Sequence, residues 1–216
     1  MVEADVDLKR LLSHGLLWIE PVHAGGREPS IISRGFSSAG YDLTLGNEFL
    51  VPDEAYFERD LDPKDFDDRL FRRVVTDCPV RVYPRGFVLA TTREYVSIPR
   101  THIGLVIGKS TYARCGVVVY VTPVEPGFYG QITLEIHNSS PFWVKIYPGE
   151  GIAQMLLLRL SNVPEKDYST KGGVYQGQTG VTPPRVWRHE HCAVPGAPTF
   201  GCGEEVYNYT VLRGGS

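Results

Sequence analysis

Between residues 80 and 158 the chain alternates short apolar segments with proline, glycine or charged residues, and this spacing constrains the fold more than any other feature. Short segments rich in Val, Ile, Leu and aromatic side chains are typical of β-strands, and turn residues at close intervals favour antiparallel pairing. The predicted strands are Val80–Tyr83, Phe87–Thr91, Tyr95–Ile98, Ile103–Ile107, Val117–Thr122, Gln131–Asn138, Trp143–Tyr147 and Ile152–Leu158. We therefore expect a mainly β fold, as a sandwich, barrel or jelly roll.

The preceding residues add one short helix and two strands to this pattern. Val6, Leu8, Leu11 and Leu12 share one face of a helix predicted over residues 5–14, with Asp5 as its N-cap and Gly15 at its end. The predicted strands run from Leu16 to Glu20, where Pro21 stops the first, and from Tyr41 through Gly46 into Phe49–Val51. Residues 52–73 are rich in Asp, Glu and Arg, which predicts a surface excursion with one helical turn after Pro63.

Composition limits the classes of partner. With 22 Lys and Arg against 25 Asp and Glu, the net charge is −3, so no basic field indicates nucleic acid as a partner. No apolar run reaches the ~20 residues of a membrane span, and the acidic N-terminus is unlike a signal peptide. We expect a cytoplasmic protein with no membrane partner. Its four cysteines, which show no close pairing, are then expected to be free thiols.

The C-terminal part differs in composition from the strand region. Residues 160–185 are polar, glycine-rich and interspersed with aromatics, which predicts a mobile flap that forms no core. We expect one domain over residues 1–185, including this flap at 160–185, followed by an extension of unknown role at 186–216. The cluster His189-Glu190-His191-Cys192 with Cys202 has a spacing that fits no standard metal site, so we expect no protein-bound metal.

A glycine-led polar turn, Gly108-Lys109-Ser110-Thr111, lies between two predicted strands. Glycine allows close backbone approach to a phosphate, the hydroxyls donate hydrogen bonds and the lysine supplies charge. Arg114 follows one helical turn later, so residues 109–114 are predicted to form a short helix with its first amides toward an anion. The alternative is an ordinary capped turn. The pattern is not a Walker loop, because GxxxxGK[ST] is absent.

A single carboxylate, Glu135, lies among apolar neighbours in the strand Ile132-Thr133-Leu134-Glu135-Ile136. Alternation assigns Thr133 and Glu135 to one face. Either that face is solvated, or it lines a pocket in which burial tunes the Glu135 pKa for proton transfer. A zinc nucleotide deaminase needs H-x-E with P-C-x-x-C, and neither occurs in the sequence.

Taken together, these segments resemble the dCTP deaminase branch of the dUTPase superfamily, from about residue 5 to residue 185. The matching segments are Tyr41–Asn47, Gly108–Arg114, Val124–Gly130, Ile132–Glu135, Ile152–Gln154 and Val174–Gly180. The resemblance implies a homotrimer of distorted jelly-roll or β-sandwich subunits of the dUTPase-like type, with sites at subunit interfaces. It also implies hydrolytic deamination of dCTP to dUTP and ammonia without zinc, and dTTP as a feedback inhibitor.

The resemblance also implies roles for individual residues. Glu135 corresponds to the catalytic general base and acid, and Ser110 and Arg114 to positions that orient it and the water. Triphosphate would bind Lys109, Ser110 and Thr111 and carry Mg²⁺ with it. The remaining substrate-binding positions are Glu125 on the sugar 3′-hydroxyl, Gln154 in its strand, and Tyr168, Lys171 and Gln178 on the flap.

Departures from the family pattern leave alternatives open. Lys109 replaces an arginine, Val174 replaces a lysine, and the turn from Thr122 to Gly127 is two residues shorter than in the pattern. The alternatives are a deaminase that also cleaves the triphosphate to give dUMP, a dUTPase-like pyrophosphatase, a deaminase of a modified dCTP, and a nucleotide-sensing module without catalysis.

Overall fold

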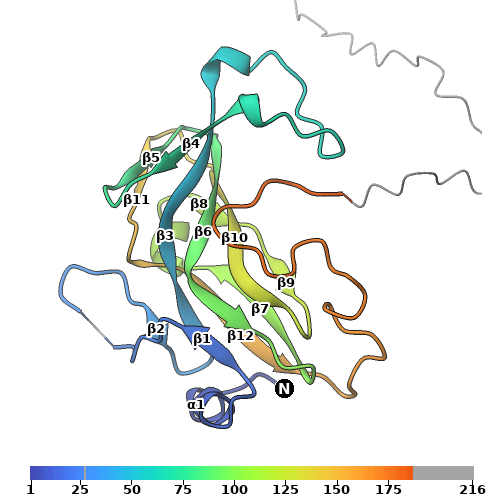
Figure 1. Cartoon of the computed structure of the whole chain (residues 1–216). Helices are drawn as coiled ribbons and strands as arrows, with labels where there is room; N and C mark the ends of the chain where they lie inside the picture. Colours follow the sequence, from blue (N-terminus) through green and yellow to red (C-terminus); the bar gives the residue numbers. More distant parts are fainter. Residues whose placement is uncertain (27, 187–216) are drawn as a thin grey trace, which may run out of the picture. The chain divides into compact units, whose positions relative to one another are not determined.

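The computed structural model describes residues 1–26 and 28–186. The extension expected at 186–216, apart from Val186, and the His189–Cys192 cluster with Cys202 lie outside the described residues. The described part is mainly β, as predicted (Figure 1). Its strands are β1 (Trp18–Glu20), β2 (Gly35–Phe36), β3 (Tyr41–Pro52), β4 (Phe71–Val75), β5 (Val80–Val82), β6 (Phe87–Ser97), β7 (His102–Gly108), β8 (Val117–Val119), β9 (Thr122–Val124), β10 (Tyr129–Asn138), β11 (Val144–Ile146) and β12 (Gly151–Arg159).

The strands form a curled sheet in the order β8-β10-β6-β3-β12-β7-β9, to which β1, β2 and β4 add at the side, while β5 and β11 pair separately. All pairings are antiparallel. The two ends of this order, β8 and β9, are joined by only Tyr120 and Val121. The sheet therefore folds back on itself around one apolar core, as expected for a distorted jelly roll.

Three of the predicted strands were wrong in where the chain divides. Phe87–Thr91 and Tyr95–Ile98 were expected as separate strands around the charged residues Arg93 and Glu94, but they form the single strand β6. The strand continues because the Glu94 side chain is fully buried and hydrogen-bonded instead of facing water. Val117–Thr122 was expected as one strand and divides into β8 and β9.

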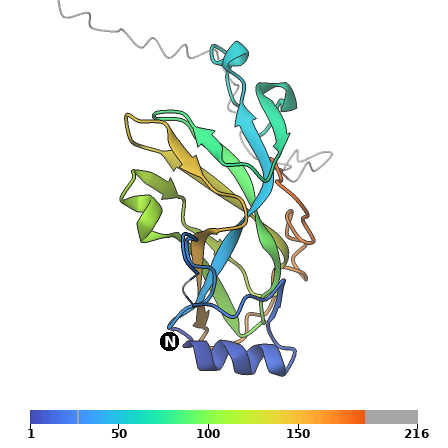
Figure 2. The same ribbon diagram turned by 90° about the vertical axis from the view of Figure 1, so that its left-hand side faces the viewer.

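Both predicted helices are present. Helix α1 (Asp5–Ser13) buries Leu8 fully and lies at the end of the sheet near the N-terminus (Figure 2). Its N-cap is Ala4 and no side chain caps it, so the prediction of Asp5 as cap was wrong, and Asp5 pairs with Lys9 instead. Helix α2 (Ser110–Ala113) follows β7 with Lys109 as N-cap.

The excursion after β3 contains two 3₁₀ turns, η1 (Glu54–Tyr56) and η2 (Asp68–Leu70), each capped by an aspartate side chain. The expected helical turn after Pro63 corresponds to η2, and η1 is an additional turn that was not predicted. Within the described residues no helix is long and apolar enough to cross a membrane.

The flap, residues 160–185, is not the coreless segment that its composition predicts. It lies along β9 and β10 (Figure 1, orange to red). Val181 is 2% exposed and packs with Leu50, Leu70, Phe71 and Leu89 in a second small core. The composition was misleading because one buried valine and many backbone hydrogen bonds hold the segment, rather than a run of apolar residues.

Candidate functional site

A cavity of about 380 Å³ opens between β9, β10 and the flap. Its base is the face of β10 that carries Thr133 and Glu135, which confirms the predicted sharing of one face. The residues that line it are Leu89, Thr122, Pro123, Val124, Glu125, Phe128, Ile132, Thr133, Glu135, Tyr168, Tyr175, Gln178, Thr182 and Pro184. The fold therefore gathers Glu125, Glu135, Tyr168 and Gln178, which the sequence placed in one site.

Glu135 is the chemically distinctive group in this cavity. Its Oε2 atom is buried and has no hydrogen-bond partner. Burial raises the pKa of the carboxyl above its ordinary value of 4.5. A desolvated carboxyl group with one unpaired oxygen at a cavity wall is suited to take a proton from a bound molecule and return it. The solvated-face alternative for Glu135 is therefore wrong.

Lys171 brings a cation to the turn that carries Glu125. The two side chains form an ion pair, and the Lys171 ammonium also lies 5.6 Å from the centre of the Tyr168 ring. Tyr168 is fixed by its backbone N–H, which donates to Pro126 O at 2.8 Å. Three residues that were separated by up to 46 positions in the sequence are thus in contact at one edge of the cavity.

The distal end of the flap is fastened to the same face of β10. Gln178 donates from Nε2 to Gln131 O at 2.6 Å, while its Oε1 is buried without a partner. The Gly180 N–H donates to Gln131 Oε1 at 2.7 Å, and the Thr182 N–H donates to Thr133 Oγ1 at 3.2 Å. Gln131 and Thr133 hold the flap, and Glu135, next on that face, is left free within the cavity.

The remaining predicted residues lie elsewhere. Lys109 donates from Nζ to Asp42 Oδ2 at 2.5 Å and to Ser33 Oγ at 3.0 Å, so its charge is already paired. Gln154 donates to Ser37 Oγ at 3.1 Å and to Ala39 O at 2.9 Å, next to the same part of β3. This cluster is separate from the cavity lining.

Ser110, Thr111 and Arg114 are exposed on or beside α2. None of them is among the residues that line the cavity. One copy of the chain therefore assembles the acidic part of the predicted site and leaves the predicted phosphate cradle on a separate surface.

Sequence reasoning missed several residues of the site. Phe128, Tyr175 and Thr182 line the cavity, and Asp42 holds Lys109. Phe128 follows the Pro126-Gly127 turn and Asp42 follows Tyr41 in the quoted motifs, so proximity to those motifs was the available signal. Thr182 follows the last matching segment, Val174–Gly180, closely in the sequence, but its place at the cavity depends on how the flap docks.

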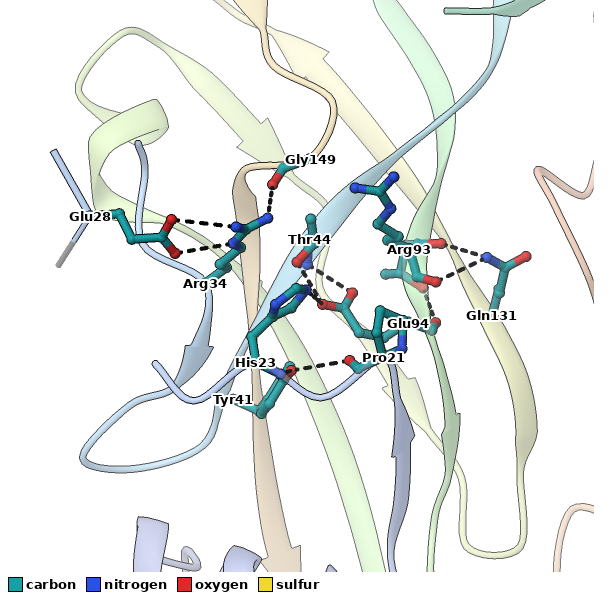
Figure 3. Close-up of polar contacts among 11 residues, drawn as sticks. Pro21, His23, Glu28, Arg34, Tyr41, Thr44, Arg93, Glu94, Gln131 and Gly149 are labelled. Carbon is teal, nitrogen blue, oxygen red and sulfur yellow. Dashed lines mark hydrogen bonds and ion pairs between the residues drawn. The ribbon is translucent and has the colours of Figure 1, made fainter. Parts of the chain in front are cut away.

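A second buried acid lies apart from the cavity (Figure 3). Glu94 accepts hydrogen bonds from Thr44 N at 2.9 Å and Thr44 Oγ1 at 2.6 Å, and its Oε1 lies 4.0 Å from His23 Nε2. Burial raises the pKa of Glu94 to about 7. Burial also lowers the pKa of His23, and the charges of Arg34 and Arg93 add to that effect.

Comparisons with known proteins identify the family to which this chain is similar. A family model described as dCTP deaminase-like matches residues 4–160. The dCTP deaminase of Herpetosiphon aurantiacus is 44% identical over 186 residues, covering 86% of this chain and 99% of the relative. That of Helicobacter hepaticus is 43% identical over 189 residues, covering 86% and 98%. The crystal structure of 2′-deoxycytidine 5′-triphosphate deaminase from Agrobacterium tumefaciens aligns with a TM-score of 0.53 and 16% identity, over 72% of this chain and 47% of that one.

Proposed function

This chain belongs to the dCTP deaminase-like family, and from that premise we propose that it is a hydrolase that deaminates dCTP to dUTP and ammonia, with Glu135 as general base and acid. The observation that carries the proposal is the buried, unpartnered carboxylate oxygen of Glu135 in the cavity. Relatives that share over 40% of their residues with this chain bear the name dCTP deaminase.

In the proposed reaction, water adds to C4 of the cytosine ring and the C4–N4 bond breaks. Glu135 takes a proton from the water as the new C–O bond forms, and gives it to the leaving nitrogen. Water is a poor nucleophile and an amide anion is a poor leaving group at neutral pH, so one carboxyl with a raised pKa that takes a proton and returns it serves both steps. Because Glu135 performs both transfers, the proposal includes no zinc.

We assign the sugar to the Glu125 turn, with Phe128 beneath it and Lys171 and Tyr168 at the edge. A triphosphate brings several negative charges, whereas the cavity lining carries two carboxylates and neither lysine nor arginine. The charge compensation must therefore come from outside the lining. Mg²⁺ would enter bound to the triphosphate and supply part of it.

The cradle Lys109, Ser110 and Thr111, with Arg114, is the other source of compensation, and it is separate from the cavity of its own chain. Ser110, Thr111 and Arg114 are exposed, whereas Lys109 is paired with Asp42 in the free chain. We therefore propose that one copy of the chain offers this cradle to the cavity of another copy, in a homotrimer. Gln154 would help to position the residues around the cradle through its hydrogen bonds to Ser37 and Ala39. Inhibition by dTTP would use the same cavity.

The first experiment incubates the purified chain with dCTP and Mg²⁺ and separates the nucleotides by chromatography. The proposal expects dUTP; dUMP would add triphosphate cleavage. Glu135→Gln is expected to lower kcat by about a thousandfold, the scale of a lost general base, and to leave dCTP binding nearly unchanged. Glu125→Gln, a change to the second acid in the same cavity, is expected chiefly to raise KM. Rapid deamination by Glu135→Gln would remove the catalytic assignment.

Chain mass in solution tests the assembly. A trimer is expected by light scattering, and mixing Glu135→Gln with Arg114→Ala chains is expected to restore activity, because some mixed interfaces then carry both intact residues. No recovery on mixing would place both residues in one subunit and contradict the shared site.

A further inference from the structure

Two charged side chains outside the cavity grip the backbone of the flap. Glu48, on β3, accepts a hydrogen bond from the Val181 N–H, with 3.1 Å between Val181 N and Glu48 Oε2. Arg73, on β4, pairs with the other carboxylate oxygen of Glu48 and donates to Val181 O, with 3.4 Å between Nη2 and that oxygen. The backbone N–H and C=O of Val181 are thus both bound by the Glu48–Arg73 ion pair.

The backbone conformation of the flap at Gly180 is compatible with this close contact. Gly180 has φ of +68°, and a Cβ added there would lie 2.1 Å from Glu48 Oε2. Only glycine therefore allows the flap to pass so close to the carboxylate, and a side chain at this position would displace either Glu48 or the flap.

The contact also sets the register of the flap over the cavity. Val181 fills the small core beside Leu89, and Leu89 lines the cavity. Gln178 and Thr182, on either side of the gripped segment, line the same cavity. A flap shifted by one residue would remove the Gln178 side chain and the Thr182 N–H from their bonds to β10.

We propose that Glu48 and Arg73 are positioning residues that latch the flap closed over the Glu135 cavity. They are not among the residues that line the cavity, and they act through Val181 on Gln178 and Thr182. The effect on turnover rests on the proposed deaminase function, whereas the latch itself does not.

The half-exposed Arg73 adds little to global stability as an ion pair, because solvent screens such pairs. Its effect is instead expected on the local opening of the flap, which needs far less free energy than global unfolding. Loss of a hydrogen bond to a charged group at this point is expected to raise the population of the open flap by about tenfold.

Hydrogen exchange on the free chain tests the latch without any substrate. Glu48→Gln, Arg73→Gln and Gly180→Ala are each expected to speed exchange of the amides of residues 180–182 by about tenfold. The amides of Leu134 and Ile136 in β10 are expected to stay protected in all three. Arg72→Gln is the matched control, because Arg72 is the neighbour of Arg73 on β4 and pairs with Asp53 at 3.5 Å. Unchanged exchange at 180–182 in all three variants would overturn the latch.

Kinetics with dCTP then test its consequence. KM is expected to rise in Glu48→Gln by the factor by which the closed fraction of the flap falls, with kcat within about twofold of wild type, because only the closed flap completes the site. A closed fraction that falls, by hydrogen exchange, while KM stays unchanged would overturn the link from latch to site. A wild-type chain that binds dCTP without turnover would refute the deaminase proposal alone, and the exchange result would still decide the latch.

Discussion

The buried carboxyl of Glu94 makes stability depend on pH, and we expect Glu94→Gln to remove that dependence. Glu94 is fully buried, and burial raises its pKa from 4.5 to about 7, despite the hydrogen bonds from Thr44 that favour the ionised form. Between these two values the unfolded chain has lost the Glu94 proton while the folded chain still holds it. The contribution of this group is therefore fully present below pH 4.5 and is lost as pH rises through about 7.

The magnitude follows from the distance between the two pKa values. Each pH unit of that interval corresponds to about 1.4 kcal/mol, so the full loss is about 3 kcal/mol. His23 titrates in the opposite sense, because burial lowers its pKa and its contribution is lost as pH falls through its ordinary value of 6.5. The charged groups that act on this pair are Arg34, Arg93 and Glu28 (Figure 3). Since His23 is present in both chains, its contribution largely cancels in the difference.

The assay is urea unfolding at one protein concentration, at pH 5, 6, 7 and 8. We expect the free energy of unfolding of Glu94→Gln, minus that of wild type, to increase by about 2.5 kcal/mol from pH 5 to pH 8, because part of the contribution is already lost at pH 5. Glu58→Gln, a change to an exposed carboxylate, is the control and is expected to give a constant difference. A constant difference for Glu94→Gln as well would show that Glu94 does not hold its proton in the folded chain.

Three further predictions concern the cavity and the flap. Because burial raises the pKa of Glu135 and the base must be ionised, the acid limb of kcat/KM for dCTP is expected above the ordinary value of 4.5, and a limb at or below 4.5 would contradict the assignment. Arg100→Gln removes the 2.7 Å pair with Asp167 at the base of the flap; urea unfolding is expected to show a loss under about 1 kcal/mol, since Arg100 is half exposed, while KM rises. Gly173→Ala is expected to raise KM with little change in kcat, because its Cβ would lie 2.2 Å from the Tyr168 ring, and an unchanged KM would show that this ring does not position substrate.

The sequence predicted the parts of the fold that depend on local pattern. Alternation identified the β10 face that carries Thr133 and Glu135, and ordered motifs brought Glu125, Tyr168 and Gln178 to one cavity. The assignment of Thr133 and Glu135 succeeded because a period of two assigns each strand residue to a face, whatever the tertiary structure. The grouping of Glu125, Tyr168 and Gln178 came from the resemblance to a family and not from periodicity.

Contacts between distant segments were not predictable in the same way. Arg93 and Glu94 indicated a turn, since charged side chains rarely enter a core, and only the Thr44 donors explain why β6 continues through them. The pairing of Lys109 with Asp42 joins residues 67 positions apart. Docking of Val181 likewise depends on Glu48 and Arg73, which no motif marked.

Glu94 and Glu135 both have a raised pKa, but their hydrogen bonding differs. This difference distinguishes a structural carboxyl from a functional one. Both oxygens of Glu94 accept hydrogen bonds from Thr44, whereas Oε2 of Glu135 has no partner. Replacing Glu94 by leucine strands the Thr44 N–H and hydroxyl, so Glu94→Leu is expected to destabilise the chain by about 2 kcal/mol. Glu135→Leu removes an unpaired polar group from a wall shared with Leu89 and Ile132, and is expected to stabilise the chain by about 1 kcal/mol while abolishing deamination. Urea unfolding at pH 8 compares the two, and a large loss in Glu135→Leu would mean that Glu135 is retained for structure.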